Sequence, residues 1–159
     1  MNTQNIEKYY TKIAEKIDCI IHEEWSKVYI YSEVLKDVVK VYFYYFSKND
    51  DSQPIYSQNM PELFGIDENE FDMSLLHLAD CFRELWQEFI NNEQEPWTNI
   101  TFILESNGKF KIDYDYTDLS EASPREQHII WKYKYLGIMP KNEYGKKVIE
   151  EYIRNTESK

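Results

Sequence analysis

Apolar residues recur at three- and four-residue steps in three parts of the chain, which is the spacing of one helix face. The most regular stripe runs from about Glu68 to Asn92 and consists of Phe71, Leu75, Leu78, Phe82, Leu85 and Phe89. Similar spacing predicts helices over about 5–22 and 142–156. A fourth helix is predicted between Pro124, at a typical first helical position, and Gly137, a typical residue just after a helix.

Other segments alternate between two kinds of side chain, which is the pattern of β-strands. They predict strands at about 25–35, 38–46, 55–58, 100–104 and 110–116. Segment 38–46 is apolar on both faces apart from Lys40, so we expect a central strand. Asn107-Gly108 favours a hairpin turn before the last strand. That strand should place Phe110 on the core face and Asp113 in water.

The order of these elements is α-βββ-α-ββ-α-α. Antiparallel hairpins followed by helices predict an α+β fold in which a sheet of four to five strands packs against helices. Segment 60–67, which contains Pro61 and Gly65, is expected to be irregular. A chain of 159 residues without a flexible linker predicts one domain over residues 1–159.

The charge balance narrows the classes of partner. The formal net charge is −11 and the pI is about 4.7. Such a surface repels nucleic acid and anionic membranes and attracts a basic protein, although acidity can also serve solubility alone. The polar N-terminus and the lack of a long apolar run lead us to expect a cytoplasmic protein.

Few residues suggest chemistry. His77 and Cys81 share a helix face, but two ligands are too few for a typical zinc site. Cys19 and Cys81 lie in helical patterns and are expected to be buried, reduced thiols. We therefore predict no catalytic residue, no cofactor and no metal.

The carboxylates of Asp113, Asp115 and Asp118 leave three interpretations open. They are a solvated face, a protein-binding surface, or the site of a metal-dependent hydrolase. A nuclease would also need cationic groups to hold phosphate, and none cluster nearby in the sequence.

Segment 131–137 interleaves lysines with aromatic residues, which can indicate base stacking. In so acidic a chain we favour a packed helix whose lysines extend to water along their apolar stems.

Four sequence features together resemble the YezG family of immunity proteins. They are Glu-Glu-Trp at 23–25, Glu-Pro-Trp-Thr at 95–98, the alternating strand at 110–116, and Trp-Lys-Tyr-Lys-Tyr-Leu-Gly-Ile-Met-Pro at 131–140. The resemblance extends over essentially the whole chain. It implies an antitoxin for a polymorphic toxin of the LXG or type VII secretion kind, which neutralises the toxin's C-terminal nuclease domain inside the producing cell. It transfers no catalytic or binding residues.

A nuclease surface must be basic to bind phosphate, so an acidic inhibitor can be steered to it. We hypothesise that a carboxylate-rich surface covers the substrate cleft of the toxin, although distortion of the toxin is an alternative. The candidate contacts are the carboxylates of Asp113, Asp115, Asp118 and Glu121 and the side chains of Tyr42, Tyr44 and Tyr116, which we expect to be exposed. A module that binds a partner other than a toxin is a further alternative, and the sequence predicts no oligomeric state.

Overall fold

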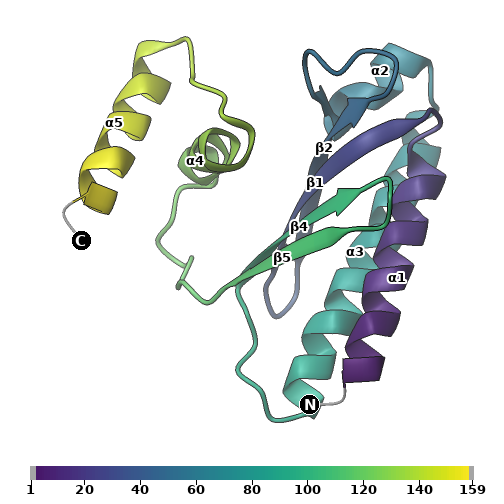
Figure 1. The fold of residues 1–159 in the computed structure, drawn as a ribbon. Helices are drawn as coiled ribbons and strands as arrows, with labels where there is room; N and C mark the ends of the chain where they lie inside the picture. The colour runs from purple at the N-terminus through teal and green to yellow at the C-terminus, as the bar shows by residue number, and fades with distance from the viewer. Residues whose placement is uncertain (1–2, 158–159) are drawn as a thin grey trace. The chain divides into compact units, whose positions relative to one another are not determined.

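Five strands in the order β3-β2-β1-β4-β5 form one antiparallel sheet in this protein, which is described by a computed structural model over residues 3–157. The chain divides into two compact units, Met1–Thr117 and Asp118–Lys159, called here the first and second unit. The predicted α+β class and element order are confirmed (Figure 1). The prediction of one domain stays a prediction, because two compact units can fold together.

The sheet belongs to the first unit. Its strands are β1 (Trp25–Val34), β2 (Val39–Ser47), β3 (Ile55–Tyr56), β4 (Asn99–Glu105) and β5 (Phe110–Asp115). The central position expected for segment 38–46 is confirmed in that β2 pairs with strands on both sides. Because β5 pairs only with β4, it forms one edge of the sheet.

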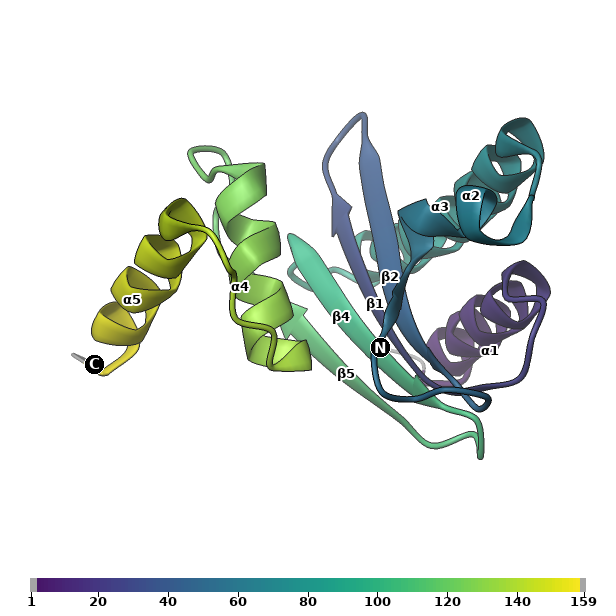
Figure 2. The ribbon, with the colours of Figure 1, turned by 90° about the horizontal axis from the view of Figure 1, so that it is seen from above.

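Two long helices, α1 (Thr3–Ile20) and α3 (Glu68–Asn91), lie on the same face of this sheet (Figures 1 and 2). The predicted stripe of α3 faces the core, and the Asp67 carboxylate caps the helix by accepting a hydrogen bond from the Glu70 backbone N–H at 3.0 Å. The core between helices and sheet contains Ile13, Ile17, Leu78, Phe82, Leu85, Val28, Ile30, Phe43, Ile100 and Phe102.

Segment 55–64 differs from expectation. Only Ile55 and Tyr56 pair with β2, and Ser57–Asn59 forms a 3-10 turn instead of continuing the strand. The buried Ser57 hydroxyl accepts a hydrogen bond from the Phe43 backbone N–H at 3.1 Å, so it replaces a strand partner of β2. The region expected to be irregular contains a short helix, α2 (Met60–Phe64).

The Asn107-Gly108 turn is confirmed, with Gly108 at φ 91° and the Asn107 side chain accepting from the Lys109 backbone N–H at 2.9 Å. The expectation that Phe110 packs in the core is wrong, since its side chain is 51% exposed. Phe110 begins an edge strand, where fewer neighbours are available to cover it.

The second unit is a pair of helices, α4 (Pro124–Leu136) and α5 (Glu143–Glu157). The predicted boundaries of α4 are confirmed: the Ser123 hydroxyl accepts from the Glu126 backbone N–H at 3.3 Å, and Gly137 ends the helix at φ 68°. Over residues 3–157, no helix is long and apolar enough to cross a membrane.

Candidate functional site

The four candidate carboxylates are divided between the two units. Asp113 and Asp115 lie on one face of β5, opposite Thr101 and Asn99 of β4, on the side away from α1 and α3. Asp118 and Glu121 belong to the second unit. The sequence grouping therefore combines one pair of carboxylates on a strand with two residues of a separate unit.

Two of these carboxylates also have local structural roles. Asp115 accepts hydrogen bonds from the backbone N–H of Thr117 at 2.9 Å and from its hydroxyl at 2.6 Å. Asp118 accepts from the Ser120 backbone N–H at 2.9 Å, and hydrogen bonds from Ser120 lower the pKa of its carboxyl. Both carboxylates stay accessible at exposed positions.

The tyrosine expectations are only partly confirmed. Tyr116 is 44% exposed, as expected, whereas Tyr42 and Tyr44 are 4% and 6% exposed, so the expectation of exposure is wrong for these two. Tyr42 stacks on Tyr31 with ring centroids 5.0 Å apart, and Tyr44 stacks on Tyr56 at 4.6 Å. Burial raises the pKa of Tyr42 and Tyr44. Tyrosines on neighbouring strands cover one another, which the pattern of a single strand does not reveal.

The thiols and histidines give no converging site. Cys81 is buried as expected, but Cys19 is exposed, because it lies on the outer side of the last turn of α1. No group of three or more His, Cys, Asp or Glu side chains within residues 3–157 could hold a metal ion.

The lysine–aromatic segment packs as part of the helix pair. The Tyr133 ring on α4 packs edge-on against Tyr152 on α5, with centroids 6.3 Å apart. Lys134 is exposed, with its ammonium 5.2 Å from the centroid of the Tyr135 ring. This agrees with the packed helix favoured from the sequence.

Negative charge is concentrated in the first unit. Residues 1–117 carry 22 acidic and 10 basic residues, a formal net charge of −12, whereas residues 118–159 carry 7 and 8, a net charge of +1. A basic partner is therefore attracted chiefly to the first unit.

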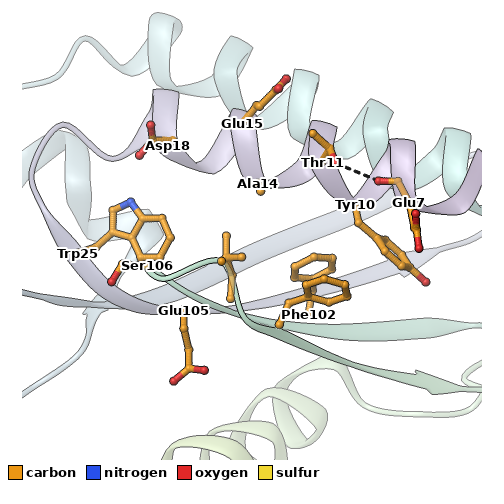
Figure 3. Close-up of a pocket in the computed structure, with 13 residues that line it drawn as sticks. Glu7, Tyr10, Thr11, Ala14, Glu15, Asp18, Trp25, Phe102, Glu105 and Ser106 are labelled. Atoms are coloured by element: carbon orange, nitrogen blue, oxygen red, sulfur yellow. Dashed lines mark hydrogen bonds between the residues drawn. The ribbon is translucent and has the colours of Figure 1, made fainter. Parts of the chain in front are cut away.

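A groove of about 610 Å³ lies in the first unit, between α1 and the hairpin of β4 and β5 (Figure 3). On α1 it is bordered by Glu7, Thr11, Ala14 and Asp18, which follow the helical spacing of four, three and four residues. Thr11 and Ala14 have short side chains, so the helix leaves space above the sheet at these positions. The volume lies within the range of about 300–1,000 Å³ that is typical of ligand clefts.

Aromatic side chains form the floor and one end of the groove. The Phe102 and Phe110 rings stack with centroids 5.8 Å apart, and the Tyr10 ring packs 5.5 Å from that of Phe110. The Tyr10 hydroxyl is hydrogen-bonded to the Tyr114 hydroxyl, which fixes this end of α1 against β5. Trp25 contributes its ring toward the other end (Figure 3).

The groove was not predicted from the sequence. The signal was the pair of small residues, Thr11 and Ala14, on the side of α1 that turns toward the sheet. These short side chains indicate a groove only in combination with an exposed Phe110, and the sequence had predicted that Phe110 packs in the core.

Comparison with known proteins identifies the family. The sequence model of the family described as "Immunity protein YezG-like" matches residues 6–150. The chain belongs to the YezG-like immunity protein family. The match crosses the boundary between the two units, so both are part of the YezG-like region.

Individual relatives agree with this assignment. The chain is 39% identical to Immunity protein YezG of Bacillus spizizenii (strain ATCC 23059 / NRRL B-14472 / W23), over 100% of the chain and 99% of that protein. It is 40% identical to Immunity protein YezG of Bacillus subtilis (strain 168), over 91% and 96%. It is 33% identical to Type VII secretion system protein EsaG of Staphylococcus aureus (strain NCTC 8325 / PS 47), over 97% of each. Membership of the YezG-like family supports an immunity role, in which a protein binds a cognate toxin.

Proposed function

We propose that this protein is an antitoxin that binds the C-terminal nuclease domain of a secreted polymorphic toxin in the cytoplasm of the producing cell. Membership of the YezG-like family over residues 6–150 carries the immunity role. The similarity to a protein named for type VII secretion supports a toxin of that secretion system. We take this toxin to be of the LXG kind as part of the proposal. The proposed role is binding alone, without a reaction catalysed by this chain.

The charge of the first unit supports a nuclease as the target. A nuclease offers cationic groups to the phosphates of its substrate, and a unit of net charge −12 presents carboxylates to the same groups. Opposite charges also raise the association rate, and added salt reduces that gain. An inhibitor of this kind can exclude nucleic acid from the cleft of the nuclease.

Within this proposal, Asp113, Asp115, Asp118 and Glu121 are candidate contacts, and Tyr116 is the aromatic candidate. Tyr42 and Tyr44 are not retained as exposed anchors, because their rings are buried. Interfaces concentrate their binding energy in a few residues, often Tyr, Trp or Arg. The 44% exposed Tyr116 ring, next to Asp115, fits that description.

The test is co-expression with the C-terminal domain of a toxin encoded beside this gene, scored by cell survival. Purified proteins would then give the affinity at several salt concentrations. Neutralising the four candidate carboxylates (Asp to Asn, Glu to Gln) should weaken binding at least tenfold at low salt and flatten the salt dependence.

A matched control neutralises four exposed carboxylates of the first unit that lie outside β5 and the segment hydrogen-bonded to it: Asp51, Glu62, Glu68 and Asp72. This control should change the affinity by less than about threefold, because exposed charges far from an interface are screened within about 10 Å at 0.1 M salt. Cells that die despite the expressed protein, together with no measurable binding, would refute the antitoxin role. Equal effects of both variants would refute this surface.

A further inference from the structure

We propose that the groove between α1 and the β4–β5 hairpin anchors a cationic segment of the partner protein, which inserts an apolar side chain between Ala14 and Phe110. The identity of the partner as the toxin rests on the proposed function. The chemistry of the site rests on the groove itself.

The floor of the groove favours an apolar side chain. Phe110 exposes 51% of its surface at the end of an edge strand, while Phe102 beneath it is 1% exposed. Phe102 and Phe110 form one continuous aromatic surface, in which Phe102 is already covered. A partner can therefore cover only the exposed part of Phe110. Covering it removes apolar surface from water without moving the rings, which are already stacked on each other.

The border of the groove favours positive charge beside that apolar side chain. Glu7 and Asp18 stand at the two ends of the α1 side, and Glu15 extends from the same helix, with its carboxylate directed away from the sheet (Figure 3). The residues that line the groove include no Lys, Arg or His. Glu105 contributes to the lining, but its carboxylate points away from α1 (Figure 3), so we assign it no role.

The opposite side of the same hairpin has the reverse charge. A second hollow that includes Phe110 is lined by Lys27, Lys109 and Lys111 as well as Glu105. A cationic segment is therefore directed to the α1 side of Phe110 and repelled from the other side. This asymmetry distinguishes a charged peptide from a purely apolar ligand, which would be insensitive to it.

Groove variants test the proposal against the toxin. Phe110→Ser removes the exposed part of the floor, and Ala14→Leu fills the space from the helix side. A third variant, Glu7→Gln with Asp18→Asn, removes the charges at the ends. Its matched control is Glu62→Gln with Asp72→Asn, on exposed residues outside the groove.

We expect Phe110→Ser and Ala14→Leu each to weaken toxin binding about tenfold or more, since a tenfold change corresponds to about 1.4 kcal/mol. The charge variant should weaken binding about three- to tenfold at low salt and less at high salt, and its control by less than twofold. Circular dichroism would show whether each variant is folded. Ala14→Leu keeps the proposal testable if Phe110→Ser unfolds, because it removes no packing.

A peptide probe tests the groove without the toxin. The probe is acetyl-Lys-Lys-Leu-Lys-Lys-amide, compared with the same peptide carrying Glu in place of Lys and with one carrying Ala in place of Leu. Two-dimensional NMR should show shifts at the Trp25 indole N–H and at the amides of Ala14 and Phe110, with the first peptide only.

The outcomes separate the two proposals. If wild-type protein binds the toxin and all groove variants bind equally well, the groove proposal is overturned and the proposed function stands. If wild-type protein neither binds nor protects, the proposed function fails, and the peptide alone decides: selective shifts support the groove, and their absence overturns it. Equal shifts with the Glu peptide overturn the requirement for positive charge.

Discussion

Glu23 holds the end of the β1–β2 hairpin together through its carboxylate. The carboxylate accepts hydrogen bonds from the hydroxyls of Tyr45 and Ser47, both at 2.6 Å, and from the Asn49 side-chain amide at 3.5 Å. Tyr45 is 0% and Ser47 is 3% exposed, so water has little access to replace the lost acceptor at these two donors. We therefore predict that Glu23→Ala destabilises the first unit.

The magnitude follows from the two short bonds. A hydrogen bond to a charged group contributes about 1.5–3 kcal/mol, so two give an upper bound of about 3–6 kcal/mol. Glu23 itself is only half-buried, and water solvates part of the exposed network. We expect Glu23→Ala to lower the free energy of unfolding by about 2 kcal/mol, and the isosteric Glu23→Gln by about 1 kcal/mol.

The effect should depend on pH with a definite sign. Hydrogen bonds from Ser47 and Tyr45 lower the pKa of Glu23 from its ordinary value of 4.5. A group whose pKa is lower in the folded state contributes stability that is fully present above the unfolded pKa. That contribution is lost as the pH falls from about 4.5 through the lower folded pKa, so the variants should approach wild type in acid.

Urea unfolding at pH 7 and at several values between pH 5 and pH 3 would measure this. The informative quantity is the difference between wild type and variant, because it cancels the titration of the other carboxylates. A matched control is Glu24→Gln, the exposed neighbour of Glu23, which should change stability by less than about 0.5 kcal/mol. A Glu23→Gln effect that is zero at pH 7, or as large at pH 3 as at pH 7, would refute the reasoning.

Two further predictions concern thiol access and packing. Native protein should react with one equivalent of a thiol reagent, at the exposed Cys19. Cys81 should react only after unfolding, because it is buried and burial raises the pKa of its thiol. Rapid labelling of both thiols in native protein would contradict this prediction. Gly145→Ala should destabilise the second unit by about 1–3 kcal/mol, because its Cβ would lie 2.4 Å from the Pro140 Cβ. Thermal unfolding compared with Gly108→Ala, where the added Cβ meets nothing within 4 Å, would separate this clash from backbone strain.

Much of the fold was predictable because local patterns carry it. The stripe of α3, the Asn107-Gly108 turn and the limits of α4 at Pro124 and Gly137 were all found from sequence. These features depend on interactions within a few residues, which periodicity and capping describe directly.

The errors arose where distant segments decide the outcome. Tyr42 alternates like a residue facing water, but Tyr31 on the adjacent strand covers it. Phe110 alternates like a core residue, but its strand lies at the sheet edge. The sequence lists the candidate carboxylates but not their division between two units. Thr11 and Ala14 border the groove, but their short side chains indicate a groove only when the position of the β4–β5 hairpin is known.

The strand order also has a consequence for folding. β1–β2 and β4–β5 are hairpins closed by short loops, whereas β1 joins β4 through pairs such as Ser32 with Ile100, with α3 between them in the chain. Closing so long a loop costs chain entropy before the contacts are gained. We expect the pairing of β1 with β4 to form in the rate-limiting step. Shortening the Ile100 side chain should therefore slow refolding in stopped-flow experiments more than an equal truncation at Val148 of α5.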